Sequence, residues 1–529
     1  MIGESTQALI FIRISIFLLR LITPGSFLYC ALVLISPFLR QTVPILDRSL
    51  FVWASSSALV WALRIFTLNE VWFYFWSQAK TAKYQVSSDY DDALTPKQRE
   101  QLFNRVIAAV DEPRRFLSGW FLGAKPEDIY RGNMVEWLLW AFFNRHTREE
   151  FSAEHPKEIV DEIDRYISTW EKAMNLTIAP GYNDKVKCIR LNADPVRTVH
   201  RPACVYLGVG VLYDFLGWSR YYSLGMRHYI PSKSSGHRIT YPYIGLPSRP
   251  SNSVLTYWYK PAAQTVSRET ETLPFIFIHG IGAGLKVYRE MITQIAEENP
   301  RSSIYLLEFP AVTMKFTDKL PQKEEFVKAV ADLLHSNGHE QALFVGHSLG
   351  TVVASWIMHL QPKLCKSVIL IDPVCFLLHL PNVAYNFLHR EPETANHWLY
   401  WYFVSNEPGI AWFLGRGFFW FENVLWLDEV PKSCDLTVYL SENDMIVDIP
   451  SVFRYLTNEP IPFNTTDKLQ SGDKIVRQSK ASPNVKTVLW SGPEMDHAVF
   501  LLMKAPTADI VNSVHSAIGQ ASSRTSKAW

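Results

Sequence analysis

Apolar residues are concentrated in long runs at the start of the chain. Residues 21–39 carry no charge and lie between Arg20 and Arg40. Their number is close to the ~20 residues that an α-helix needs to cross a bilayer. An apolar stretch over residues 8–19 comes before them, and a shorter one over residues 49–63 follows. The pattern predicts one or two membrane segments in this region.

Other interpretations of these runs remain open. Pro24, Gly25 and Pro37 weaken the longest run as a straight helix, although membrane helices tolerate such residues better than soluble ones. A secretory signal peptide is a rival, but Arg13 and Arg20 interrupt the apolar residues that such a peptide keeps uncharged. A buried helical hairpin in a soluble protein is a further alternative.

A cluster of rings at residues 72–76 follows the apolar runs. Amphipathic rings of this kind collect in the headgroup layer of a bilayer. We therefore expect residues 1–86 to anchor the chain to a membrane, and we expect that membrane to be intracellular. The sequence indicates no particular organelle.

The polar segment over residues 87–99 marks a change of pattern. From Thr95 to about Ile230 apolar residues recur at helical spacing. The recurring positions include Leu102, Val106, Ile107, Val110, Ile159, Ile163, Tyr166 and Ile167. We expect a helical domain over residues 87–235 that packs on the rest of the chain, shapes the entrance to its site or docks to the membrane.

Beyond a loop predicted over residues 231–236, short apolar strands alternate with amphipathic helices. Strands are predicted at residues 254–259, 275–278, 303–308, 342–345, 367–371, 436–440 and 485–490. Such alternation predicts an α/β fold, in which a mostly parallel sheet has helices on both faces. We assign residues 236–529 to this domain.

The strand at residues 342–345 leads into Gly346-His347-Ser348-Leu349-Gly350, which has the pattern G-x-S-x-G. In this pattern a strand turns sharply into a helix and presents the serine oxygen above the sheet, with glycines where side chains would clash. The preceding strand and the following helical pattern make Ser348 a candidate nucleophile. An ordinary glycine-rich strand–helix turn is the plainer alternative.

A serine hydroxyl is a weak nucleophile and needs a base within hydrogen-bond reach. His497 follows the last predicted strand, where a loop can carry it to the edge of the sheet. His515 lies in a helical stretch, where we expect it to be a surface residue. His347 sits inside the turn and cannot fold back, so we expect it to be a packing residue. His497 is therefore the predicted base.

An acid should orient the base and stabilise its charged form. Asp444 follows the strand at residues 436–440, and Asp372 follows the preceding strand. We favour Asp444 on loop position, because Asp372 also suits a simple strand end. Glu442 and Asp448 are weaker alternatives.

The intermediate of acyl transfer carries a negative oxygen that two backbone N–H groups must stabilise. Leu349, directly after the serine, would supply one donor. Ile281 would supply the other from the loop His279-Gly280-Ile281-Gly282, whose glycines allow close approach. We expect His279 itself to hydrogen-bond the loop backbone.

Rings are dense between Asp372 and Leu436, a spacing too long for one crossover helix. They are Phe376, Tyr385, Phe387, Trp398, Tyr400, Trp401, Tyr402, Phe403, Trp412, Phe413, Phe418, Phe419, Trp420, Phe421 and Trp426. Exposure of so much aromatic surface is costly unless it meets substrate, membrane or protein. We expect a lid over about residues 376–432 that packs on the N-terminal helices, lines an apolar substrate path, or both.

Composition narrows the function further. Lys and Arg total 52 against 51 Asp and Glu, which gives a formal net charge of +1. This balance gives no electrostatic reason to expect nucleic-acid binding. None of the six cysteines forms a C-x-x-C pair or lies in a metal-binding pattern with histidines. We expect no metal, no cofactor and no disulfide framework, and the sequence names no protein partner.

From about residue 254 onward the chain resembles the α/β-hydrolase family, with HGIG, GHSLG, SENDMIV and MDHAVFL in the family's order. The resemblance implies an eight-stranded, mostly parallel sheet and a Ser-Asp-His triad. The chain is also similar to membrane-associated members with a helical N-terminal extension.

These features favour a lipase- or esterase-like serine hydrolase that cleaves a lipid or another hydrophobic ester through an acyl-enzyme on Ser348. An acyltransferase would use the same residues, with an alcohol in place of water. A non-catalytic scaffold that binds lipid or protein is the alternative of another class, but it would not need an intact triad.

Overall fold

The computed structural model describes residues 3–42, 58–86, 94–143, 157–209, 214–232, 237, 239–241, 248–263, 272–461 and 473–525. The apolar residues 49–57, the polar residues 87–93 and the predicted domain boundary at 235–236 lie outside these ranges.

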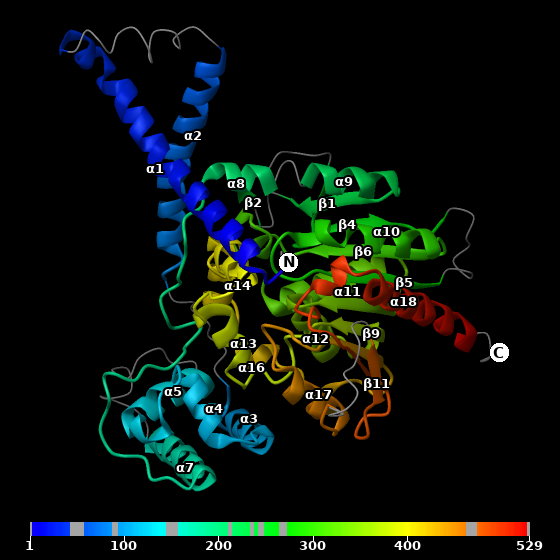
Figure 1. Cartoon of the computed structure of the whole chain (residues 1–529). Coiled ribbons are helices and arrows are strands. Elements are labelled where there is room, and N and C mark those ends of the chain that lie inside the picture. Colours follow the sequence, from blue (N-terminus) through cyan, green and yellow to red (C-terminus); the bar gives the residue numbers. More distant parts are fainter. Residues whose placement is uncertain are drawn as a thin grey trace.

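Two long helices form a hairpin that projects from the rest of the molecule (Figure 1). Helix α1 spans Thr6–Thr42 and helix α2 spans Ala58–Lys83. The sequence predicted separate apolar stretches over residues 8–19 and 21–39, but α1 runs through both without a break. A proline removes one backbone donor, and the hydrogen bonds of the neighbouring turns keep the helix continuous. Within the described chain, one helical stretch, Thr6–Ile35, is long and apolar enough to cross a membrane, as a signal sequence also would be.

A separate group of helices follows (Figure 1). These are α3 Pro96–Ala109, α4 Pro113–Trp120, α5 Arg131–Phe143 and α7 Lys157–Met174. Rings fill the space between them, with Phe116 stacked on Trp170 at 4.9 Å between ring centroids. The helical periodicity therefore predicted the described part of this region correctly as far as Met174.

The expectation of helix up to about Ile230 is wrong for the residues that follow. Residues 175–202 contain no helix, and between them and Ile230 the described part of the chain has the α-helices α8 Ala203–Leu207 and α9 Asp214–Ser223. Strand β1, Arg227–Pro231, pairs antiparallel with β4, Thr256–Lys260. Residues assigned to the helical segment thus extend the main sheet.

The main sheet has ten strands within the described residues, in the order β11-β12-β10-β9-β8-β5-β6-β4-β1-β3. The remaining bounds are β3 Arg249–Ser251, β5 Thr272–Ile278, β6 Ser302–Glu308, β8 Ala342–His347, β9 Cys365–Ile371, β10 Asp435–Ser441, β11 Lys474–Gln478 and β12 Val485–Trp490. The six strands from β12 to β6 run parallel. All seven predicted strands are present, but the expected number of eight is too low. The additional strands β1, β3 and β11 lie toward the edges and carry polar residues or proline, so no apolar pattern marked them.

Alternation along β5 shows how the sheet builds two cores. Phe275 and Phe277 pack with α10, Arg289–Glu298, and α18, Lys504–Thr525. Ile276 and Ile278 face the opposite core, which includes residues of α11, Lys323–Ser336, and α12, Leu349–Leu360. Successive side chains of a strand point to opposite faces, so a strand buried on both sides reads as a continuous apolar run.

Several short helices lie between β9 and β10 and form a cap, defined here as residues 376–432. They are α13 Asn382–Ala384, α14 Ala395–Tyr400, α15 Pro408–Arg416 and α16 Trp420–Asn423, with π-helical turns at Tyr385–His389 and Trp401–Ser405. The cap packs on α1, where Ile12 and Ile16 meet Ala395 and Tyr402. Many of its rings, among them Tyr402, Phe413 and Trp420, are buried inside the protein.

Candidate active site

The turn at the end of β8 has the geometry that the glycine pattern requires. Ser348 has φ +52° and ψ −119°, a conformation that costs energy for any residue with a side chain. A Cβ on Gly350 would lie 2.1 Å from the Ile278 carbonyl oxygen, and one on Gly346 would lie 2.5 Å from the Gly350 oxygen. The two glycines therefore permit the close packing that holds Ser348 in this bend.

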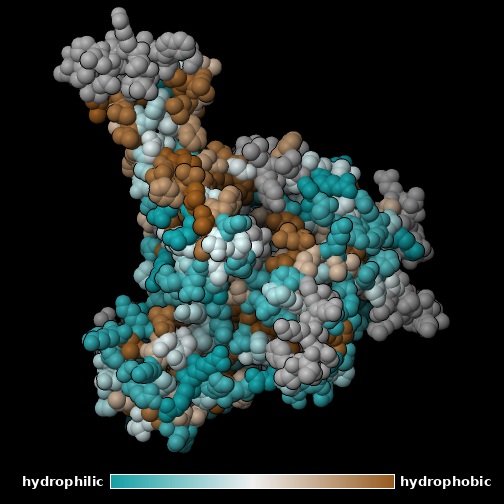
Figure 2. Space-filling model, in the orientation of Figure 1, coloured by the Kyte–Doolittle hydropathy of each residue, from teal (hydrophilic) through white to brown (hydrophobic). Residues whose placement is uncertain are grey.

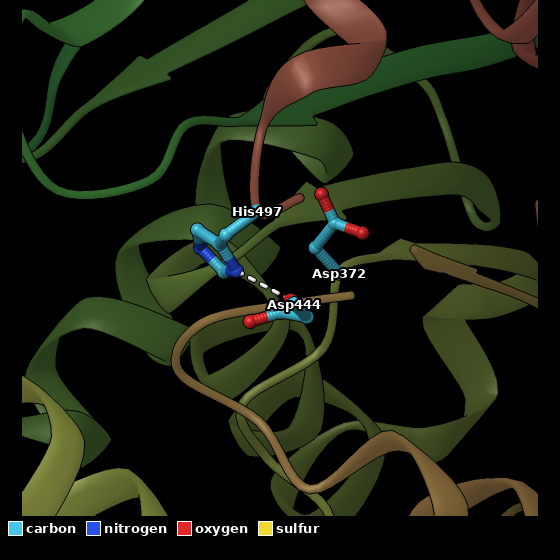
Figure 3. Close-up of side chains that lie close together, drawn as sticks. All are labelled: Asp372, Asp444 and His497. Atoms are coloured by element: carbon cyan, nitrogen blue, oxygen red, sulfur yellow. Dashed lines mark hydrogen bonds and ion pairs between the residues drawn. The ribbon is translucent and has the colours of Figure 1, made fainter. Parts of the chain in front are cut away.

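A line of hydrogen bonds runs from the serine to a carboxylate. His497 Nε2 lies 2.9 Å from Ser348 Oγ, and His497 Nδ1 lies 2.7 Å from Asp444 Oδ2. Figure 3 shows His497 and Asp444 joined across two loops. With Nδ1–H donating to the carboxylate, Nε2 is free to accept from the hydroxyl. All three side chains are buried, although Ser348 and His497 are 149 residues apart.

Asp444 is fixed by its own loop, which follows β10. Its Oδ1 accepts from the backbone N–H groups of Ile446 at 2.8 Å and Val447 at 3.0 Å. These bonds leave Oδ2 directed at His497 and hold the carboxylate in one orientation.

Asp372 lies beside this pair but has other partners (Figure 3). Its Oδ1 accepts from Ser441 Oγ at 2.7 Å, and its Oδ2 accepts from the Ala498 N–H at 2.8 Å. Asp372 is fully buried at the end of β9, with φ +43°. Its hydrogen bonds tie the strand end to the loop that carries His497.

The other sequence candidates lie elsewhere. Glu442 accepts from the Gly492 N–H at 2.9 Å, and Asp448 accepts from the Ser451 N–H at 3.3 Å at the start of α17, Ile449–Thr457. His515 lies on α18 with Nδ1 3.1 Å from Asn299 Oδ1. None of these hydrogen bonds joins the residue to Ser348 or His497.

Carboxylates dominate the electrostatics around the base. Burial alone would lower the pKa of His497, but the charge of Asp444 and its hydrogen bond, with smaller contributions from Asp372 and Asp496, raise it to about 9. Burial also raises the pKa of Asp496 to about 6. The ligand-type atoms of Asp372, Asp444 and His497 lie within 4.8 Å of one another, as in a metal site. Since both nitrogens of His497 are already hydrogen-bonded, we interpret the cluster as a proton-transfer site.

The loop after β5 lies against the serine. A Cβ on Gly280 would lie 2.9 Å from Ser348 Cβ, so only glycine allows this approach. His279 Nε2 accepts from the Phe309 N–H at 3.0 Å, and its Nδ1–H donates to the Gly280 carbonyl at 2.7 Å. Gly282 has φ +124°, and its N–H donates to the Val312 carbonyl at 2.9 Å. The structure thus gives His279 the backbone contacts expected of it.

The two expected oxyanion donors, Ile281 and Leu349, line the inner of the two cavities at Ser348 together with the serine. Ile281 lines both cavities next to Ser348. Leu349 is the first residue of α12, and the N–H of a first helical residue has no intrahelical acceptor. Their role as donors remains a prediction.

The sequence did not indicate the part played by Tyr288. Its hydroxyl accepts from the Gly280 N–H at 3.1 Å and lies 2.6 Å from His347 Nδ1. His347 is therefore more than a packing residue, because it joins the turn of Ser348 to the loop of Gly280 through Tyr288. Tyr288 lies six residues beyond that loop in no recognisable motif, so only the folded chain reveals the contact.

Two cavities meet at Ser348. The outer cavity, of about 420 Å³, is lined by His347, Ser348, His497, Leu399, Tyr400, Val404, Leu501, Leu502 and residues 281–283 and 286–290, among others. The inner chamber, of about 50 Å³, has Ser348 in its wall and otherwise apolar side chains. A larger hollow, of about 1580 Å³, lies between α4, the cap and α17, and Ser348 is not in its wall.

The ten-stranded, mostly parallel sheet and the strained serine turn define the class of protein: the chain has the α/β-hydrolase fold. Residues 274–403 match the family described as "alpha/beta hydrolase fold".

Among known proteins, 99 residues are 31% identical to a "Probable alcohol acetyltransferase" of Cyberlindnera fabianii, over 18% of this chain and 26% of the relative. The chain thus spans about a quarter of that relative's length. A solved membrane phospholipase A, described as a bacterial virulence factor, is 13% identical with a TM-score of 0.35, over 60% of this chain and 94% of its own. The carboxylesterase CesB from Bacillus subtilis is 10% identical with a TM-score of 0.34, over 59% of this chain and 98% of its own. Structural similarities this weak carry no further argument.

Proposed function

We propose that the protein is a serine ester hydrolase that works through an acyl-enzyme on Ser348. The observation that carries the proposal is the continuous hydrogen-bonded line from Ser348 through His497 to Asp444. A hydroxyl, an imidazole and a carboxylate in this order activate an oxygen for attack on an acyl carbon.

In the proposed reaction Ser348 Oγ attacks the ester carbonyl carbon while its proton passes to His497 Nε2. The N–H groups of Ile281 and Leu349 stabilise the oxygen that becomes negative. The ester C–O bond then breaks, and His497 returns the proton to the leaving alcohol. Water, deprotonated by His497, attacks the acyl-enzyme, so that the acid is released and Ser348 regains its proton.

We propose a hydrophobic ester, such as a lipid, as the substrate. Leu399, Val404 and Leu501 line the outer cavity beside Ser348 and His497. At its rim, 66% of the Leu502 surface is exposed, so a greasy substrate would meet apolar side chains on entry. Pockets lined largely by apolar groups with a few placed polar ones are typical of small-molecule sites.

We also propose that the α1–α2 hairpin holds the protein on an intracellular membrane. Large apolar side chains are exposed along both helices, including Phe11, Phe17, Leu28, Leu34, Leu59, Trp61, Ile65 and Trp72. Figure 2 shows this hydrophobic surface on the hairpin, above a largely hydrophilic body. Surface of this extent would be covered by lipid.

A second candidate is acyl transfer from the same acyl-enzyme to an alcohol. The match to a probable alcohol acetyltransferase favours it, although that match covers only a small part of either chain. The two reactions differ in whether water or an alcohol attacks the acyl-enzyme.

The test is turnover of p-nitrophenyl esters by the full chain in detergent, beside Ser348→Ala and His497→Ala. We expect hydrolysis by the wild type and a loss of ~10⁴-fold or more in both variants. Added ethanol or a longer alcohol would give ethyl or alkyl esters if transfer competes. Equal activity of wild type and Ser348→Ala would contradict the proposal.

A further inference from the structure

The inner chamber beside Ser348 offers a ligand almost nothing but hydrocarbon and ring surface. Its wall consists of Trp120, Leu191, Ile281, Ser348, Leu349, Val374, Leu378, Val383, Ala384, Phe387, Leu388, Leu414, Phe418, Trp420 and Ile446. The two indole N–H groups in this wall are already occupied. Trp120 Nε1 donates to the His379 carbonyl at 2.9 Å, and Trp420 Nε1 donates to the Ala141 carbonyl at 3.0 Å.

The two cavities lie on chemically different sides of the nucleophile. His497 lines the outer cavity but not the inner chamber, whereas Leu349 lines the inner chamber but not the outer cavity. The base that protonates a leaving alcohol must reach its oxygen. An ester bound to Ser348 would then place its alcohol in the outer cavity and extend its acyl chain into the inner chamber.

Two residues of the inner wall come from outside the α/β-hydrolase fold. Trp120 ends α4, and Leu191 lies in the irregular segment after α7. The Ile189 N–H donates to the Trp120 carbonyl at 2.9 Å, which ties these two parts together. The Trp120 ring packs 5.3 Å from that of Trp140, centroid to centroid, so the wall is held by the core of the helical segment.

The chamber is small. Its volume is about 50 Å³, against about 420 Å³ for the outer cavity. A short acyl chain would fit there without movement of the wall, whereas a long one would require the wall to move.

On the basis of the proposed function, we propose that the inner chamber is the acyl subsite, that it takes short acyl chains, and that Trp120 and Leu191 from the N-terminal helical segment set their length. This segment then determines specificity, in addition to supporting the fold.

The test compares Leu191→Ala and Leu191→Phe with the wild type on p-nitrophenyl acetate, butyrate, octanoate and dodecanoate. Leu191 is half-buried, which makes either change tolerable. Leu176→Ala is the matched control, since Leu176 is a half-buried leucine of the same segment that does not line the chamber.

We expect the wild type to prefer acetate and butyrate. Leu191→Ala should raise the ratio of kcat/KM for octanoate over butyrate by ~10-fold or more, the scale of discrimination for a few methylenes in an apolar pocket. Leu191→Phe should lower the ratio of butyrate over acetate, and Leu176→Ala should change neither. A preference for dodecanoate in the wild type, or a chain-length profile that Leu191 variants leave unmoved, would overturn the acyl subsite.

Labelling by a fluorophosphonate in the same samples tests the acyl subsite and the hydrolase activity separately. A labelled enzyme with an unmoved profile contradicts only the assignment of the chamber. An unlabelled, inactive wild type contradicts the hydrolase itself.

Discussion

At the scale of single residues, the site depends on which carboxylate holds the base. Loop position alone favoured Asp444 over Asp372, and Asp444 is the one hydrogen-bonded to His497. The sequence placed both acids at neighbouring strand ends. It could not show that Ser441 Oγ and the Ala498 N–H donate hydrogen bonds to the carboxylate of Asp372. Such partners depend on tertiary packing, which one-dimensional spacing does not encode.

Exchange of each acid for its amide separates the two roles. Asp444→Asn should lower kcat by up to ~10⁴-fold, because it removes the charge that orients and stabilises the imidazolium. Asp372→Asn keeps the shape of a side chain that makes no hydrogen bond to the His497 ring. We therefore expect kcat to fall by less than ~10²-fold. Steady-state kinetics on one ester measure both, and a larger loss in Asp372→Asn would assign the acid to Asp372.

The pH profile follows from the charge around the base. His497 must be neutral to accept the serine proton, and its neighbours raise its pKa to about 9. The value of kcat/KM should therefore rise about tenfold per pH unit from pH 6 and level off above about pH 9. In Asp444→Asn the midpoint of the pH profile should move to lower pH, and the plateau of kcat/KM should be lower than in the wild type. A wild-type profile already flat at pH 7 would contradict this assignment of charge.

At the scale of secondary structure, the elements that could be predicted were those with a pattern in their own local sequence. The strands buried on both faces and the glycine turn were visible as local patterns. Strand β1, with the sequence Arg-His-Tyr-Ile-Pro, showed no such pattern. It is a strand because it pairs with the neighbouring strands of the sheet, not because of its own sequence. The hydrogen bond between Tyr288 and His347 was equally invisible, since it joins segments 59 residues apart in the sequence.

The serine turn gives the sharpest prediction at this scale. Gly350→Ala places a Cβ against the Ile278 carbonyl, and we expect the free energy of unfolding to fall by about 1–3 kcal/mol or more. Gly208→Ala is the control, because a Cβ at Gly208 has no atom within 4 Å. Chemical denaturation of both variants makes the comparison. A Gly350→Ala protein as stable as the control would mean that the turn is looser than the structure has it.

At the scale of the whole molecule, the hairpin, the cap and the site form one connected arrangement. Ile12 and Ile16 of α1 pack on the cap, and Leu399 and Tyr400 of the cap line the outer cavity. Attachment of the hairpin to lipid would thus bring the cavity close to substrates dissolved in the membrane. The sequence suggested each part, whereas the contact between α1 and the cap required the folded chain.

Membrane attachment can be tested through the exposed side chains of α1. Replacement of Phe17, Leu28 and Leu32 by Gln should move the protein from the carbonate-resistant membrane fraction toward the supernatant, because each side chain is exposed and apolar. Val476→Gln, at an exposed position on β11, is the control and should not alter the distribution. If the triple variant stays in the membrane fraction, these faces of the hairpin do not carry the attachment.

The most direct measurement for the whole account is the site of covalent modification by a fluorophosphonate, read by mass spectrometry of the full chain and its peptides. We predict one adduct, on Ser348, that is absent in Ser348→Ala and strongly reduced in His497→Ala. An adduct on another residue, or none in folded wild-type protein, would contradict the claim that Ser348 is the activated nucleophile.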